Sequence, residues 1–141
     1  MTQFQSLETV IPLLQPCIVV EDDAIILLDI EHTLRHLGFS DIRTSTTLAI
    51  GSKLADAPDI RLALLDFELG RTVTSLALAE ALLRRGIPMV FLTAYGADLQ
   101  LPSSLAHIPI IAKPFTTEML AATLAGLTRA GAAAKSPCVC S

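Results

Sequence analysis

Asp66 is the residue of this sequence whose type and setting point most clearly to chemistry. It ends the apolar run 62–65 and is followed by the loop 67–71. Four consecutive apolar residues between polar flanks predict a short strand that is buried on both faces, as in a parallel sheet. Ligands of open α/β sheets bind at the carboxyl ends of the strands. An Asp at this point can therefore act as a nucleophile or as a metal ligand.

Three other apolar runs also end on side chains that can bind ions or phosphate. Run 17–20 is followed by acids, run 88–92 by a hydroxyl group and run 108–112 by an ammonium group. We expect these runs to be strands parallel to the Asp66 strand, so that their polar end residues fall on one edge of the sheet. The residues gathered there are Glu21, Asp22, Asp23, Thr93 and Lys113.

This group of side chains is predominantly acidic. Crowded carboxylates raise each other's pKa unless a cation joins them. Hard oxygen ligands with few protein contacts favour Mg²⁺, which retains several waters and commonly bridges to phosphate. Lys113 can meet a second anionic group as a point charge, and Thr93 can donate a hydrogen bond to it. The residues therefore predict a Mg²⁺ site with a carboxylate nucleophile, suited to a phosphoryl group.

The segments between the strands have the periodicity of helices. Residues 24–37 carry an apolar stripe at helical spacing, and Gly38 is expected to end that helix in a left-handed conformation. The other helices are predicted from their caps and apolar spacing. They are expected through about residue 55 after the cap Ser45 or Thr46, at about 74–85, and after the cap Thr116.

The alternation of strands and helices predicts one α/β domain over residues 16–130. Its five-stranded parallel sheet would be doubly wound, with helices on both faces. The less apolar strand 41–44 is expected near a sheet edge. The segment 97–107 has a broken apolar pattern, so its helix, the fourth, is expected to be short or mobile. Residues 1–15 are interpreted as a lead and residues 131–141 as a flexible tail.

The composition excludes several classes of function. The 141 residues are 52% hydrophobic and carry a formal net charge of −4, with no basic cluster that would bind nucleic acid. Every apolar run is shorter than the roughly 18 residues that span a bilayer, and no secretory signal is recognisable. The three cysteines do not form a disulfide framework. We therefore expect a cytoplasmic domain that binds neither nucleic acid nor membrane.

Four short motifs stand, in order, at the expected strand ends. They are Val19–Asp23, Leu64–Asp66, Phe91–Ala94 and Lys113–Phe115. Together they resemble the receiver domain of two-component response regulators, the CheY-like family, over residues 16–130. The resemblance implies the flavodoxin-like strand order 2-1-3-4-5. It also implies a phosphoacceptor that acts by protein–protein contact or as a phosphorelay intermediate or sink. Such a protein is not an enzyme beyond its own Mg²⁺-dependent phosphorylation and dephosphorylation.

The resemblance assigns three residues to phosphoryl transfer. Asp66 would be the phosphoacceptor, and it would take the phosphoryl group from a histidine kinase or a histidine phosphotransfer protein. Lys113 would contact the phosphoryl oxygens, and Thr93 would move to donate a hydrogen bond to them. Positive charge and backbone amides would neutralise the charge that develops on the equatorial oxygens.

The resemblance assigns the Mg²⁺ ligands to residues at the ends of the first and third strands. Asp22 and Asp66 would bind the metal directly, and the backbone carbonyl of Glu68 would be a third ligand. Glu21 would act through a metal-bound water. Asp23 lies one place beyond the usual acidic pair, so we expect it to contribute less.

The sequence departs from the family pattern at three places. Ile110 stands where the family has its switch aromatic, so the usual coupling between a moving Thr and a swinging ring cannot operate in that form. The loop 70–74 replaces the frequent Pro and Asp-Gly of the family. Glu68 and Tyr95 lie two residues beyond Asp66 and Thr93, at positions that tune phosphate lifetime in the family.

The segment around the fourth strand is similar to a subgroup of stand-alone receivers with a "FAT GUY" motif. The similarity is carried by Gly86-Ile87-Pro88 and by the stretch 91–96. It implies a single-domain regulator, often paired with HWE-type histidine kinases, and a loosely ordered fourth helix. We expect a monomer or a weak dimer.

Two alternative functions use the same residues. An Asp-nucleophile phosphohydrolase would share the acid, hydroxyl and lysine positions, and Glu68 stands where such an enzyme has its general acid. That class typically has an Asp there and needs a cap domain and a later acidic motif, which this chain lacks. A receiver that only docks and is never phosphorylated is the other alternative. The presence of Asp22, Asp66 and Lys113 argues against it.

Overall fold

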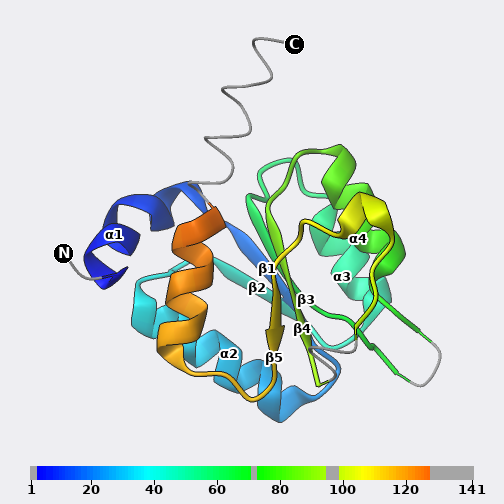
Figure 1. The fold of residues 1–141 in the computed structure, drawn as a ribbon, viewed down its shortest axis with the longest axis horizontal. Helices are drawn as coiled ribbons and strands as arrows, with labels where there is room; N and C mark the ends of the chain where they lie inside the picture. The colour runs from blue at the N-terminus through cyan, green and yellow to red at the C-terminus, as the bar shows by residue number, and fades with distance from the viewer. Residues whose placement is uncertain (1–2, 71–72, 95–98, 128–141) are drawn as a thin grey trace, which may run out of the picture.

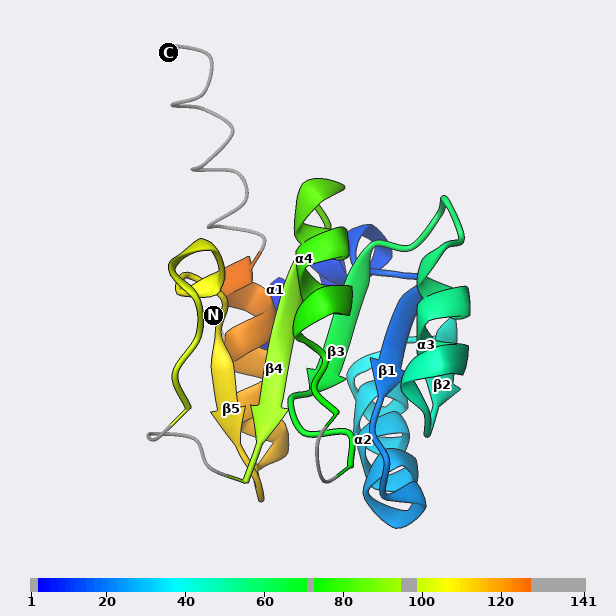
Figure 2. The ribbon, with the colours of Figure 1, turned by 90° about the vertical axis from the view of Figure 1, so that its right-hand side faces the viewer.

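The chain folds into a five-stranded parallel sheet. The computed structural model describes residues 3–70, 73–94 and 99–127, without the side chains of residues 3–6. Figure 2 shows the strands side by side in the order β2-β1-β3-β4-β5. This order confirms the predicted flavodoxin-like topology. The strands are β1 (Cys17–Val20), β2 (Ile42–Ser45), β3 (Leu62–Asp66), β4 (Met89–Thr93) and β5 (Ile110–Ala112).

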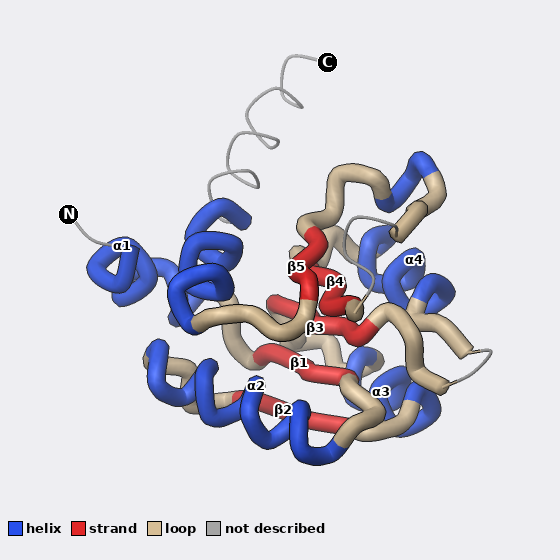
Figure 3. Tube along the Cα trace, turned by 60° about the horizontal axis from the view of Figure 1, so that its bottom comes forward, coloured by secondary structure: helices blue, strands red, loops and turns tan. Residues whose placement is uncertain are grey.

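Helices cover both faces of the sheet (Figures 1 and 3). One face is covered by α1 (Gln3–Val10), α2 (Ala24–Leu37) and the helical residues 117–127, the other by α3 (Leu48–Ala55) and α4 (Leu76–Arg84). The central strands are buried on both sides. Val19 packs toward the α2 face, and Ile18 and Val20 pack toward the α3 face. This explains why the strand runs are continuously apolar instead of alternating.

The strand register brings the four strand ends to one edge. Val20 of β1 pairs with Leu65 of β3, Asp66 pairs with Leu92 of β4, and Thr93 pairs with Ala112 of β5. Neighbouring strands therefore end within one residue of each other. The polar residues that follow them share one surface, as expected for parallel strands.

Two glycines occupy positions where a side chain would be strained or would clash. Gly38 has φ of 117° and ends α2, and the Phe39 N–H donates to the Leu34 carbonyl at 3.0 Å, as in a Schellman motif. Gly51 lies in α3 against β1. A Cβ added there would lie 2.7 Å from Val20 Cγ2, so only glycine lets this helix approach the sheet so closely.

Several predicted boundaries are corrected by one to three residues. α3 is capped by Thr47, whose side chain accepts from the Ile50 N–H, and not by Ser45 or Thr46. Ser45 instead is the last residue of β2, opposite Val20. The physical reason is that β2 extends one residue further than predicted, which displaces the helix start. α4 and β5 are shorter than predicted at their ends.

The predicted fourth helix is a short 3-10 turn in the part of this segment that the structure describes. The turn covers Ser103–Leu105, directly after Pro102, and buries Leu105. Thr116 caps the last helix as predicted, since its hydroxyl accepts from the Met119 N–H at 3.1 Å. Leu120 and Leu124 of that helix are in the core, in agreement with the apolar spacing from which the helix is predicted.

The lead segment joins the core. Leu7, Ile11 and Leu14 are buried among residues of α2 and of the last helix. Gln15 Oε1 accepts from the backbone N–H groups of Ser40 and Asp41, at 2.9 and 3.1 Å. The lead is therefore tied to the loop between α2 and β2. The predicted tail, 131–141, lies outside the described residues. Within the described ranges, no helix combines the length and the apolar character needed to cross a membrane.

Candidate functional site

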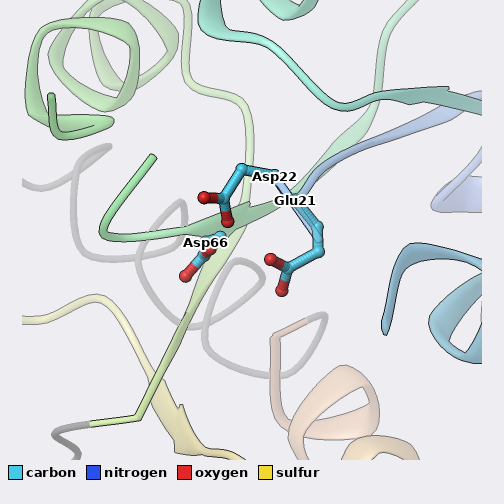
Figure 4. A group of neighbouring side chains, drawn as sticks. All are labelled: Glu21, Asp22 and Asp66. Carbon is cyan, nitrogen blue, oxygen red and sulfur yellow. The ribbon is translucent and has the colours of Figure 1, made fainter. Parts of the chain in front are cut away.

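Three carboxylates meet at the carboxyl edge of the sheet. Glu21 and Asp22 directly follow β1, and Asp66 ends β3. One carboxylate oxygen from each residue lies within 4.8 Å of the others. Figure 4 shows that the three carboxyl groups converge on the same space. Glu21 and Asp66 are buried, whereas Asp22 is exposed, so the cluster is open to solvent on one side.

Asp23, the third acid of the sequence Glu21-Asp22-Asp23, has a different task. Its Oδ1 accepts from the N–H groups of Ile25 and Ile26, at 2.9 and 3.1 Å. It is thus the N-cap of α2, and its negative charge is favourable at the N-terminus of a helix. The sequence ranked Asp23 below its two neighbours as a metal ligand, and in the structure one oxygen of its carboxylate is engaged by the helix.

Lys113 supplies the positive charge of the site. It directly follows β5, and its Nζ lies 2.9 Å from Glu21 Oε1 and 3.2 Å from Asp66 Oδ1. The Lys113 N–H also donates to the Thr93 carbonyl at 2.8 Å, which fixes the backbone of the lysine against β4. The lysine therefore bridges acids from two different strands, which are separated from it by 47 and 92 residues in sequence.

The electrostatics of the cluster favour a cation or a neutralised acid. The pKa of Asp66 is raised from 3.8 to about 8, mainly by burial and then by the hydrogen bond with Glu21 and the negative charge of Glu21, while the charge of Lys113 opposes the change. For Lys113, burial lowers the pKa. The hydrogen bond to Glu21 and the charges of Asp66 and Glu21 outweigh burial, so the pKa lies above its usual value of 10.5.

Thr93 and Glu68 contact one another. Thr93 ends β4 and is fully buried, and its Oγ1 donates to Glu68, 3.1 Å from Oε1 and 3.4 Å from Oε2. The sequence pointed to both residues but not to their contact. The contact depends on the path of the chain between β3 and β4, and no sequence spacing reveals that path.

The backbone around Glu68 is held by an antiparallel bridge to Thr74. The bridge is formed by the Leu69 N–H to the Val73 carbonyl, at 2.8 Å, and by the Ser75 N–H to the Phe67 carbonyl, at 3.0 Å. Neither of these two bonds uses the Glu68 carbonyl, the group that the resemblance assigns to the metal.

Of the two remaining candidate residues, the structure describes Ile110. Ile110 begins β5 opposite Phe91 and packs, partly buried, against the core on the α4 side. An aliphatic core contact therefore occupies the position of the switch aromatic. Tyr95 lies outside the described residues.

The arrangement can hold a cation between carboxylates and an anion beside the lysine. Beside the lysine is a cavity of about 360 Å³ between α2 and the segment after β5. Hydrophobic side chains form most of its wall. Its lining residues are Ile26, Asp29, Ile30, Ala94, Lys113, Pro114 and Phe115.

Comparison with known proteins identifies similar folds. No protein-family model matches the sequence, and a comparison with curated proteins finds no match. Among solved structures, SdrG from Sphingomonas melonis Fr1 is 34% identical; the match covers 79% of this chain and 94% of SdrG, with a TM-score of 0.69. A response regulator receiver protein from Sinorhizobium medicae WSM419 is 22% identical over 82% of this chain and 94% of its own, with a TM-score of 0.66.

The chemotaxis protein CheY4 of Vibrio cholerae shares the same fold at a lower identity. It is 19% identical over 79% of this chain and 96% of its own, with a TM-score of 0.65. At such identities the last two matches establish the fold alone. The match to SdrG covers nearly all of that protein at higher identity, so it establishes a family relationship.

Proposed function

Since this chain belongs to the response regulator receiver family, we propose that it accepts a phosphoryl group on Asp66 from a phosphohistidine. The donor would be a histidine kinase, such as one of the HWE type, or a histidine phosphotransfer protein. The observation that carries the proposal is the bridge from Lys113 Nζ to both Glu21 and Asp66, at 2.9 and 3.2 Å. It places one compact positive charge beside the carboxylate that would be modified.

The transfer forms one bond and breaks another. An oxygen of the Asp66 carboxylate attacks phosphorus, the new P–O bond forms, and the P–N bond to the donor imidazole breaks. The imidazole nitrogen leaves with the electron pair and takes a proton from water. In dephosphorylation, water attacks the phosphorus of the aspartyl phosphate. The Asp66 carboxylate is then the leaving group, and inorganic phosphate is released.

The residues fit a Mg²⁺ ion. Three carboxylates within 4.8 Å of one another, two of them buried, are a hard-oxygen donor set with an excess of negative charge. Asp22 and Asp66 would hold the ion together with the Glu68 carbonyl, and Glu21 would contribute through water. When bound, Mg²⁺ supplies positive charge that offsets the charge on the phosphoryl oxygens. Lys113 would contact the same oxygens, and its positive charge offsets the repulsion between Asp66 and Glu21.

The surface beside the site supports a protein as donor. Ile25 and Leu28 on α2 are 80% and 66% exposed, and they lie on the helix that Asp23 caps at the site. Exposed large apolar side chains beside a functional site are typical of contact surfaces. The cavity beside Lys113 opens next to the same helix. A helix that carries a phosphohistidine could cover this surface while it presents its imidazole to Asp66.

After phosphorylation, the protein would act by binding other proteins and not by catalysing a reaction on other molecules. A phosphorylated receiver of this kind either changes its affinity for a partner or removes phosphate from another regulator. The chain would act as a monomer or a weak dimer. In the contact role, phosphorylation would shift an existing equilibrium between two conformations.

Intact mass spectrometry after incubation with acetyl phosphate tests the proposal. Wild type, Asp66→Asn and Lys113→Ala would be compared with Mg²⁺ and with chelator. We expect a gain of one phosphoryl group in the wild type that needs Mg²⁺, is absent in Asp66→Asn and is reduced in Lys113→Ala. Steady turnover of acetyl phosphate without an adduct would instead favour a phosphohydrolase. No adduct with any donor, a phosphohistidine protein included, would leave a docking receiver and contradict the proposal.

A further inference from the structure

The hydroxyl of Thr93 is engaged by a carboxylate that phosphoryl transfer does not require. Thr93 Oγ1 donates to Glu68 at 3.1 Å. Thr93 is fully buried, and buried hydroxyls are almost always hydrogen-bonded. A threonine hydroxyl has a single proton to donate. The contact with Glu68 therefore occupies the same donor that a phosphoryl group on Asp66 would need.

The strand order places Thr93 next to the position of that phosphoryl group. β4 lies between β3 and β5, so the end of β4 lies between Asp66 and Lys113. The Lys113 side chain spans the width of β4, since its Nζ lies 3.2 Å from Asp66 Oδ1. A phosphoryl group that is bonded to Asp66 and contacts Lys113 therefore lies over the end of β4, where the Thr93 hydroxyl can reach it.

The backbone holds Glu68 in position for this contact. The Phe67 N–H donates to the Leu92 carbonyl at 2.9 Å, which binds the start of the loop to β4. The bridge between Glu68 and Thr74 ties the same loop to the segment before α4. The Glu68 side chain is partly exposed, so its carboxylate can return to solvent when Thr93 turns away.

We infer that Glu68 is a positioning residue that competes with the phosphoryl group for the Thr93 hydroxyl. In the resting protein Thr93 donates to Glu68. In the phosphorylated protein Thr93 donates to a phosphoryl oxygen, and water replaces it at Glu68. The Glu68–Thr93 contact thus stabilises the resting conformation and lowers the population of the phosphorylated one. This inference rests on the proposed phosphoacceptor function of Asp66, and it adds a regulatory role for Glu68.

A double-mutant cycle on the unphosphorylated protein tests whether the contact exists. Glu68→Ala, Thr93→Val and the double variant would be unfolded with denaturant in the presence of chelator. We expect the two substitutions to be non-additive, with a coupling of about tenfold in the unfolding equilibrium constant, as for a hydrogen bond to a charged group. Additive effects would overturn the inference. Thr93→Ser keeps the hydroxyl and is expected to retain most of the coupling.

A second cycle measures the competition by the phosphorylated fraction at a fixed acetyl phosphate concentration with Mg²⁺. Glu68→Ala is expected to raise the ratio of phosphorylated to unphosphorylated protein about tenfold when Thr93 is present. It is expected to have little effect in the Thr93→Val background, because no hydroxyl remains to be released. Glu68→Gln retains an oxygen acceptor without the charge, so its effect is expected to be smaller than that of Glu68→Ala.

The outcomes separate the inference from simpler explanations. If Glu68 acted only by repelling the phosphoryl group, Glu68→Gln and Glu68→Ala would have equal effects, and both effects would persist in Thr93→Val. That result would overturn the competition. A wild type that gains no phosphoryl group from any donor would contradict the proposed function and the competition together. The stability cycle would still decide, by itself, whether Glu68 holds Thr93.

Discussion

Replacing Asp66 by Asn is expected to stabilise the metal-free protein, and increasingly so as the pH rises from about 4 to about 8. In the folded chain, burial and the nearby Glu21 raise the pKa of this carboxyl from 3.8 to about 8. Between these values the folded state holds a proton that the unfolded state has released. Stability therefore falls with rising pH, by at most about 1.4 kcal/mol per pH unit. Asn has nearly the same shape and no charge, so it removes this dependence.

The magnitude follows from the width of the pH interval. A pKa raised over about four pH units sets an upper limit of about 6 kcal/mol on the gain at pH 8. Small rearrangements and the entry of water relieve part of this cost. We therefore expect a gain of about 2 kcal/mol at pH 7.5 and almost none at pH 4.

Denaturant unfolding in chelator at several pH values measures the effect. Asp59→Asn is the matched control. Asp59 is exposed, and its pKa is lowered by the hydrogen bond to Arg43, so its loss is expected to have the opposite sign above pH 4. A gain from Asp66→Asn that is independent of pH, or a loss at pH 7.5, would refute the reasoning that crowded, buried charge destabilises the site.

Three further predictions concern the metal, the donor surface and the sheet. MgCl₂ at about tenfold above its dissociation constant is expected to raise the free energy of unfolding by about 1.4 kcal/mol; titration calorimetry should show weaker binding by Asp22→Asn, and equal binding would contradict the assignment. Ile25→Ser is expected to slow phosphotransfer from a histidine kinase about tenfold, but to leave phosphorylation by acetyl phosphate unchanged; equal loss with both donors would argue against a contact surface. Gly51→Ala is expected to lower the free energy of unfolding by about 1–2 kcal/mol, because the added Cβ meets Val20. Gly126→Ala is the control, since a Cβ there has nothing within 4 Å, and it is expected to stabilise the protein. Thermal unfolding measures both effects, and equal effects of the two substitutions would contradict the close approach of α3 to β1.

The sheet and the site edge could be predicted because they depend on simple patterns. A strand buried on both faces needs a continuous apolar run, and 62–65 is such a run. Parallel strands all end on the same edge, so an acid after one run and a lysine after another must come together. This topology predicts that Lys113 and Asp66 share one edge of the sheet, whereas their ion pair is seen only in the structure.

The local details that depend on register could not be predicted. Ser45, Thr46 and Thr47 are all good N-caps, and the choice among them depends on where β2 stops pairing with β1. Likewise the Glu68–Thr93 hydrogen bond joins the loop after β3 to the end of β4, and it depends on the path of that loop, which is bridged to Thr74.

The contribution of the lead to the core has a similar explanation. Leu7, Ile11 and Leu14 have helical spacing, but the prolines at positions 12 and 16 limit any helix to a short piece. A short helix is stable only when it packs against something. Here the partner surface is made by residues of α2 and of the last helix, and no pattern within the lead itself reveals it.

Phosphorylation of Asp66 is tested most sharply by locating the phosphoryl group on the chain. After incubation with Mg²⁺ and a phosphodonor, borohydride reduces an aspartyl phosphate to homoserine, which peptide mass spectrometry can place in the sequence. We expect homoserine at position 66 and at no other acid of the site. Modification at Asp22 or Asp23, or a phosphoryl gain in intact mass that persists in Asp66→Asn, would contradict it.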